Sequence, residues 1–264
     1  MNKVMVYVVS LSGSARRPSI EKQLSNLGVN FQFLDAVYGR DLPPNIIKNI
    51  NDELLVKKRY NRNVGVGEIG CAFSHQDVYK RMSDDCVDFA IILEDDVFVR
   101  NKITDFIKFM EEVRFEKHSG LADSLFILGK QDGLSSHEMI VFSNRNKICV
   151  SSDCVIRKLN FSEKYVYGTF GYAISSRVAS KLVEISNKGF YLADDWSFLY
   201  NKNAFSNIYY EDIIVHPPVG SSGSLIEHER MHSSQNSSQR WRYSATRRIL
   251  RWFKANLRQI MRFM

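Results

Sequence analysis

The chain has 264 residues, of which 44% are hydrophobic and 25% charged, so it can bury a sizeable core without disulfides or structural metals. The net charge of +7 is concentrated late in the chain: eight basic residues lie between Arg240 and Arg262, and no Asp or Glu follows Glu229. The first 239 residues are therefore close to neutral, and they carry no basic stripe of the kind that binds nucleic acid.

Four cysteines (Cys71, Cys86, Cys149 and Cys154) are scattered and form no paired zinc motif. We expect reduced, mostly buried thiols in a reducing compartment. The apolar run at residues 4–9 is too short for a signal peptide, and no stretch approaches 18 apolar residues. These features predict a cytoplasmic protein that does not span a membrane.

The first elements follow a β-loop-α-β order. Residues 4–11 form a continuous β-rich run typical of a central parallel strand. A polar loop at 12–17 leads to a helix that Pro18 opens and that ends near residue 27, and residues 31–37 read as a second strand. This order predicts an α/β fold with a mainly parallel sheet flanked by helices.

The middle of the chain alternates polar and apolar segments. Residues 41–64 are polar and irregular, and we expect a mobile loop there. A helix is predicted from residue 67 to about 82. An apolar strand at 87–93 follows it, and residues 97–99 are predicted to continue that strand.

Later elements complete the predicted domain. Helices are expected at 103–113 and 178–186, and strands at 124–128 and 208–216. We therefore expect a catalytic domain over residues 1–218. A linker or lid is predicted over 219–239 and an amphipathic helix over 240–264.

Three consecutive carboxylates, Glu94, Asp95 and Asp96, end the most apolar predicted strand. Uncompensated charge beside a core costs on the order of several kcal/mol per ion, so a compensating partner is expected. Strand alternation would turn Glu94 and Asp96 to one side, where two carboxylates can hold Mg²⁺ or Mn²⁺. The alternative is an exposed, salt-bridged turn.

Separate segments resemble glycosyltransferase family 25, which includes lipooligosaccharide galactosyltransferases and collagen-modifying sugar transferases. The similar segments are Val6-Tyr7-Val8-Val9-Ser10-Leu11 with Arg16-Arg17, Gly67-Glu68-Ile69-Gly70-Cys71-Ala72-Phe73-Ser74-His75, Ile91-Ile92-Leu93-Glu94-Asp95-Asp96-Val97, Phe33-Leu34-Asp35-Ala36-Val37-Tyr38-Gly39-Arg40 and Gly171-Tyr172-Ala173-Ile174-Ser175. The resemblance covers roughly residues 4–200. It implies a GT-A-type, Rossmann-like fold, a UDP-sugar donor, Mn²⁺ or Mg²⁺, and transfer with inversion.

The resemblance assigns metal contacts to Glu94 and Asp96, with Asp95 supporting the ribose or the metal. His216, which ends a late strand, is the candidate third metal ligand; its alternative is a structural histidine. For the donor, the candidates are Leu11, Arg16 or Arg17, Glu68, Ser74, His75, Gly171 and Tyr172. The alternative for the arginines is a solvated loop. For Glu68, Ser74 and His75 it is a helix cap with a half-buried histidine, and for Gly171 and Tyr172 it is a strand packed in the core.

Asp194-Asp195 resembles a later acidic motif of the family, and either residue is a candidate for the base that accepts the acceptor's proton. The alternative is a helix N-cap, since Asp195 directly precedes the apolar segment that begins at Trp196.

Residues 240–264 fit a helix with basic and apolar faces, which is typical of helices that lie on anionic membranes. The alternative is docking on the chain's own domain or on a second subunit in a homodimer. Together, these features predict a peripheral enzyme on the inner face of the cytoplasmic membrane. It would transfer a hexose, with galactose as first choice, to a lipooligosaccharide or LPS acceptor. The rival functions are a metal-dependent nucleotidyltransferase or phosphohydrolase and, ranked last, a nucleic-acid-binding protein.

Overall fold

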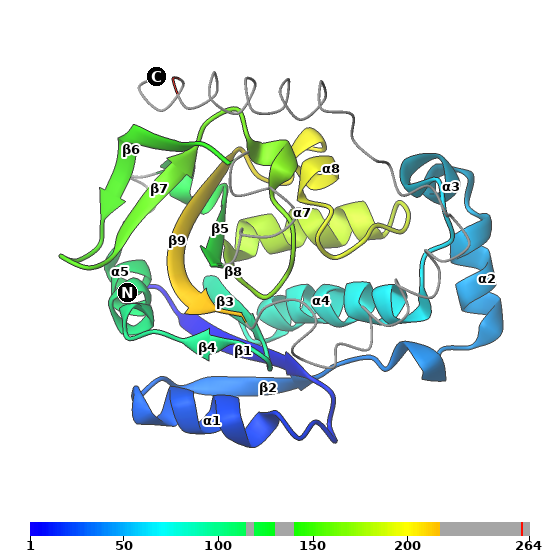
Figure 1. The fold of residues 1–264 in the computed structure, drawn as a ribbon, viewed down its shortest axis with the longest axis horizontal. Helices are drawn as coiled ribbons and strands as arrows, with labels where there is room; N and C mark the ends of the chain where they lie inside the picture. Colours follow the sequence, from blue (N-terminus) through cyan, green and yellow to red (C-terminus); the bar gives the residue numbers. More distant parts are fainter. Residues whose placement is uncertain (115–118, 130–139, 217–259, 261–264) are drawn as a thin grey trace, which may run out of the picture.

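A computed structural model describes residues 1–114, 119–129, 140–216 and 260. In this part of the chain, nine strands form one sheet in the order β2-β1-β3-β8-β5-β9-β7-β6, with β4 paired to β9 (Figure 1). The strands are β1 Val4–Ser10, β2 Phe31–Asp35, β3 Phe89–Glu94, β4 Phe98–Val99, β5 Ser124–Gly129, β6 Phe142–Cys149, β7 Val155–Leu159, β8 Gly171–Ser175 and β9 Asn207–Val215.

Most of the central strands run in the same direction. β1 pairs in parallel with both β2 and β3, and β5 pairs in parallel with β9. β8 is antiparallel to its two neighbours, β3 and β5, and therefore separates these two parallel groups. The predicted α/β class with a mainly parallel central sheet is confirmed.

Helices cover both faces of this sheet. Alternate residues of β1 and β3 point to opposite sides, so Val8 and Ile91 pack with α1 (Arg17–Asn26) and α5 (Lys102–Glu112). Tyr7 and Ile92 pack instead with α4 (Val66–Asp84) and α7 (Ser176–Ser186). The short helices α6 (Ser119–Ala122) and α8 (Trp196–Asn201) complete the order. Two hydrophobic layers thus fix the strand ends that carry the acidic residues.

The predicted mobile loop at residues 41–64 is wrong, because two helices form there: α2 (Pro44–Asp52) and α3 (Leu54–Tyr60). Ile50 of α2 and Val56 of α3 are buried beside Ile69 of α4 in a third, smaller cluster. Figure 1 shows both helices beside the N-terminal end of α4. Burial of these few apolar side chains is what orders an otherwise polar segment.

The predicted continuation of the acidic strand is also wrong. β3 ends at Glu94, a turn holds Asp95 and Asp96, and β4 leaves in a new direction to pair with β9. The alternation of side chains therefore does not extend past Glu94. Burial of the cysteines differs from expectation as well, since only Cys154 is buried while Cys86 and Cys149 are exposed.

The remaining predicted helices and strands agree with the structure within a few residues. The linker or lid at 219–239 and, apart from residue 260, the amphipathic helix at 240–264 lie outside the described residues. Among the helices that the structure describes, none has the length and apolarity needed to cross a bilayer.

Candidate functional site

A cleft opens where the parallel strands β1, β2 and β3 reach their carboxyl ends. Residues 9–11, 36–40 and 94–96 line it, each set at or directly after one of these strands, together with Arg16. The opposite wall is one side of α4, formed by Gly67, Cys71, Ser74 and His75. Ligands of open α/β sheets bind at this kind of position.

Asp95 holds the first loop of the cleft. Its carboxylate accepts hydrogen bonds from the hydroxyls of Ser10 (2.7 Å) and Ser14 (2.6 Å), and Arg16 Nε lies 2.8 Å from Oδ1. Asp95 is only 5% exposed, whereas the Arg16 side chain remains 45% exposed. Arg16 is therefore anchored at one end of its guanidinium and still accessible from the cleft.

Arg17, the other candidate arginine, has a different position. Its guanidinium donates to the Ser10 carbonyl (2.8 Å), pairs with Asp35 and lies 4.7 Å from the centre of the Phe33 ring. These contacts join the ends of β1 and β2, and Arg17 is not among the cleft-lining residues. Of the two arginines, the structure places Arg16 in the cleft.

Asp96 and His216 are brought together across 120 positions of sequence. His216 Nε2 lies 3.3 Å from Asp96 Oδ2, and Arg16 Nη1 lies 3.8 Å from the same oxygen. Asp96 Oδ1 is buried and has no hydrogen-bond partner among the described residues. Burial alone would raise the pKa of Asp96, but hydrogen bonding and charge from His216, and then the charge of Arg16, lower it below its usual value.

The arrangement of β4 and β9 explains why these two side chains meet. Phe98 pairs with Val215 and Val99 with Ile214, so the residues just before β4 and just after β9 are neighbours. The His216 ring also packs on Phe170, with 4.2 Å between ring centres. His216 therefore lies beside the acidic turn, and its role as a metal ligand stays a prediction.

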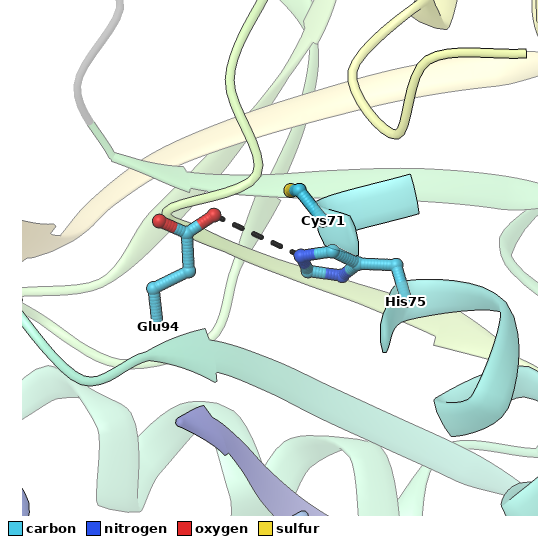
Figure 2. A group of neighbouring side chains, drawn as sticks. All are labelled: Cys71, His75 and Glu94. Atoms are coloured by element: carbon cyan, nitrogen blue, oxygen red, sulfur yellow. Dashed lines mark ion pairs between the residues drawn. The ribbon is translucent and has the colours of Figure 1, made fainter. Parts of the chain in front are cut away.

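The Glu94 carboxylate lies beside His75 of α4. It accepts a hydrogen bond from Thr169, and His75 Nε2 lies 3.7 Å from its Oε1. Figure 2 shows Cys71, His75 and Glu94 converging from α4 and the end of β3; one ligand-type atom of each lies within 4.8 Å of the others. Sequence reasoning gave Cys71 no role, although its separation of four residues from His75 on a helix was the available signal.

His75 connects the cleft to a buried hydroxyl pair. Its Nδ1 lies 2.8 Å from the Tyr172 hydroxyl, which lies 2.9 Å from the Tyr79 hydroxyl. Burial raises the pKa of Tyr172 well above its ordinary value, so the hydroxyl stays neutral. Tyr172 is fully buried, and a Cβ on Gly171 would lie 2.5 Å from Ile214 Cδ1. The expected donor contact of Gly171 and Tyr172 is corrected: both are core residues, and Tyr172 reaches the cleft only through His75.

Glu68 and Ser74 hold the wall in place. Glu68 is 4% exposed, forms two charged hydrogen bonds with Arg62 (2.6 and 2.7 Å), and accepts one from the Gly65 N–H (3.0 Å). It acts as the N-terminal cap of α4 and does not line the cleft, which corrects its expected donor contact. Ser74 lines the cleft, but its hydroxyl accepts from the Val37 N–H (2.8 Å) and donates to a carbonyl in its own helix.

Two glycines allow α4 to approach the segment after β2. A Cβ on Gly70 would lie 2.6 Å from Val37 O and 2.7 Å from Gly39 N, and one on Gly39 would lie 1.9 Å from Val66 O. Contacts of this kind leave no room for a side chain. The shape of the cleft therefore depends on glycine at both positions.

Asp194 and Asp195 differ in how their oxygens are used. Asp195 caps α8 by accepting from the Phe198 N–H (3.2 Å), and its second oxygen accepts from the Tyr60 hydroxyl (3.0 Å). Asp194 Oδ2 accepts a hydrogen bond from the Gly168 N–H (3.2 Å), one residue before the Thr169 that contacts Glu94. Asp195 therefore caps a helix, as the alternative predicted. Asp194 is linked to the acidic turn through the segment that holds Gly168 and Thr169.

The sequence has recognisable relatives. The profile of glycosyltransferase family 25 (LPS biosynthesis protein) matches residues 3–197. Procollagen galactosyltransferase 1-B of Xenopus laevis is 27% identical over 73% of this chain and 30% of its own length. Procollagen galactosyltransferase 2 of Homo sapiens is 28% identical over 74% of this chain and 30% of its length. A Mus musculus relative, 27% identical over 67% of this chain and 28% of its length, is named as an inactive family member.

The chain thus spans less than a third of the length of these curated relatives. Among solved structures, a glycosyltransferase involved in glycosylation of the major capsid of PBCV-1 has 11% identity and a TM-score of 0.41, over 88% of this chain and 99% of the other. That likeness is too weak to carry an argument. The profile match covers most of the chain, and on that ground the chain belongs to glycosyltransferase family 25.

Proposed function

We propose that this chain is an inverting glycosyltransferase that moves a hexose from a UDP-sugar to a lipooligosaccharide or LPS acceptor. The family description supports the acceptor class, and the names of the curated relatives make galactose the first sugar to test. The observation that carries the proposal is the cleft at the ends of parallel strands, which Arg16 and Asp96 line and where Asp96 also contacts His216.

The residues in the cleft fit a divalent cation, Mn²⁺ or Mg²⁺. Asp96 has a buried oxygen without a hydrogen-bond partner in the described part of the chain, and a cation would satisfy it. Asp96 and His216 would hold the ion, with Glu94 at the other end of the same turn as a further carboxylate. A bound ion would neutralise charge on the departing diphosphate.

The chain's own residues supply the remaining steps. Arg16, anchored by Asp95, presents its half-exposed guanidinium to the diphosphate, and its planar fork matches phosphate oxygens. The segment at 36–40 is held against α4 by the hydrogen bond from Val37 N–H to Ser74 and by the close approach at Gly70, and both elements line the cleft. These contacts would orient the donor.

Asp194 is the proposed base, because both carboxylate oxygens of Asp195 are engaged in the cap of α8 and with Tyr60. The acceptor hydroxyl would give its proton to Asp194 as its oxygen bonds to the anomeric carbon. The bond between that carbon and the diphosphate oxygen breaks, and UDP leaves with the bonding electrons. Attack from the face opposite the diphosphate inverts the anomeric configuration, as in the two-sided arrangement of inverting glycosidases.

The test is a donor screen with UDP-galactose, UDP-glucose and UDP-GlcNAc in the presence of Mn²⁺, with lipooligosaccharide as acceptor and UDP release as readout. We expect UDP release that depends on the acceptor and on the cation. The rival nucleotidyltransferase or phosphohydrolase would release nucleotide products without regard to the acceptor. If no donor supports acceptor-dependent release, the proposed function is wrong.

We also propose that residues 240–264 bind the inner face of the cytoplasmic membrane, where a glycolipid acceptor would be reached. The support is the sequence, in which eight basic residues alternate with apolar ones. Flotation with anionic vesicles, comparing the full chain with a 1–239 truncation, tests this. Equal and negligible flotation of both would remove the membrane proposal, and a dimer lost on truncation would favour docking on a second subunit.

A further inference from the structure

We infer that Cys71, His75 and Glu94 form a binding site for a thiophilic divalent cation such as Zn²⁺, separate from the Asp96–His216 pair. The three ligand atoms, one from each residue, lie within 4.8 Å of one another at the wall of the cleft (Figure 2). Two ligands of a tetrahedral zinc ion lie roughly 3.3–3.8 Å apart. Small side-chain rotations would therefore bring the three ligand atoms to the separations that a zinc ion requires.

The spacing on α4 is suited to this purpose. Cys71 and His75 are four residues apart, so their side chains project from the same face of the helix onto the end of β3. Paired ligands four apart on a helix are a recurring half-site for zinc. Glu94, arriving from the sheet, adds the third ligand from a separate element, which makes the site depend on the folded chain.

The contact between His75 and Glu94 also favours a cation between them. The distance from Nε2 to Oε1 is 3.7 Å, which is too long for a good hydrogen bond and close to the separation of two ligands on one metal. His75 is 1% exposed, so Nε2 has little access to solvent as a substitute partner. A nitrogen lone pair aimed at a carboxylate is unfavourable unless a proton or a metal ion lies between.

The surroundings resemble the outer shell of a metal site. In the proposed site His75 donates its Nδ1–H to the Tyr172 oxygen 2.8 Å away, and the Tyr172 hydroxyl donates to Tyr79, which leaves Nε2 with the lone pair. The hydroxyl of Thr169 fixes Glu94 in the same way. On binding, Cys71 gives its thiol proton to solvent and ligates as the thiolate, while the fourth position opens to the cleft.

The thiolate sets the choice of metal. Mg²⁺ and Mn²⁺ prefer oxygen ligands, whereas a sulfur, nitrogen and carboxylate set is typical of zinc. Zinc bound here would also hold Glu94, which the proposed function assigns to the donor metal. We therefore expect zinc to inhibit sugar transfer, and this consequence, unlike the site itself, rests on the proposed function.

The test uses Co²⁺ as a spectroscopic probe on the reduced, metal-stripped full-length chain. A cysteine thiolate on Co²⁺ gives a charge-transfer absorption in the near ultraviolet, which histidine and carboxylate ligands do not produce. We expect this band to saturate at about one Co²⁺ per chain and to disappear when Zn²⁺ is added, because zinc binds such sites more tightly.

The variants are chosen to preserve the fold. Cys71→Ser keeps the size of the side chain and should abolish the band, while Cys86→Ser, at an exposed cysteine, should leave it intact. Glu94→Gln leaves the cysteine in place, so it should keep the band but weaken Co²⁺ binding at least tenfold. This second variant tests the site even if Cys71→Ser fails to fold. A wild-type chain without the band, or a band that survives Cys71→Ser, would overturn the proposal.

A separate measurement addresses inhibition. In a Mn²⁺-supported transfer assay, the zinc concentration that halves activity should rise at least tenfold from the wild type to Cys71→Ser, each compared with its own zinc-free rate. The cobalt band requires no sugar transfer. Failure of the band therefore refutes the zinc site, and a band without any transferase activity refutes only the proposed function.

Discussion

Replacing Asp95 with Asn tests whether this carboxylate is a structural anchor of the cleft. Asp95 is 5% exposed and accepts from the hydroxyls of Ser10 and Ser14 at 2.7 and 2.6 Å. Hydrogen bonds to a charged group contribute about 1 kcal/mol more than neutral ones, so loss of the charge costs about 2 kcal/mol for the two. The pair with Arg16, whose side chain is 45% exposed, adds less than about 1 kcal/mol.

We therefore expect Asp95→Asn to lower the free energy of unfolding by about 2–3 kcal/mol, or roughly 4–12 °C in Tm for a chain of this size. Urea unfolding followed by circular dichroism, with unchanged m values, is the measurement. The matched control is Asp35→Asn, since Asp35 pairs with Arg17 but is 69% exposed, and its loss should cost under about 1 kcal/mol. A stability within about 0.5 kcal/mol of wild type for Asp95→Asn, or equal losses in both variants, would refute the reasoning.

Three further predictions follow from the same geometry. Asp96→Asn should abolish transfer while changing the unfolding free energy by less than about 1 kcal/mol, because one Asp96 oxygen already lacks a partner; full activity would contradict the metal assignment. Gly70→Ala should cost about 1–3 kcal/mol, since its Cβ would lie 2.6 Å from Val37 O, whereas Gly120→Ala meets its nearest atom at 3.6 Å and should not destabilise. Burial raises the pKa of Tyr60 to about 12, so the unfolded chain loses this proton first. The contribution of Tyr60 is fully present below about pH 10, and this group alone should lower stability by up to about 1.4 kcal/mol per pH unit as pH rises to 12. Other buried tyrosines with raised pKa values, among them Tyr79 and Tyr172, add to the loss, so constant urea midpoints up to about pH 11 would disprove this.

The sequence predicted secondary structure well where several apolar residues follow one another along the chain. The apolar run before Glu94 and the continuous β-rich run at residues 4–11 predicted strands that the structure confirms, because each strand is covered on both faces. His216 was a candidate metal ligand, and the structure places it 3.3 Å from Asp96, while its binding of a metal ion stays a prediction.

The misses have physical causes. Residues 41–64 were predicted as a loop because polar residues dominate, yet Ile50 and Val56 bury enough apolar surface against α4 to order two helices. Glu68 and Tyr172 were predicted to face the donor, but one is held by Arg62 and the other by the core. Which face of an element a polar side chain uses depends on partners far away in sequence.

The pairing of β4 with β9 has a consequence for the order of folding. Asp96 comes from the first half of the chain, His216 directly follows β9, and the two-residue pairing of β4 with β9 joins the segments next to them. A nascent chain that ended before residue 207 could form the β1–β3 layer but would lack the histidine. We expect the Asp96–His216 pair to form only after β9 has docked, so that a growing polypeptide cannot complete this pair until synthesis has passed residue 216.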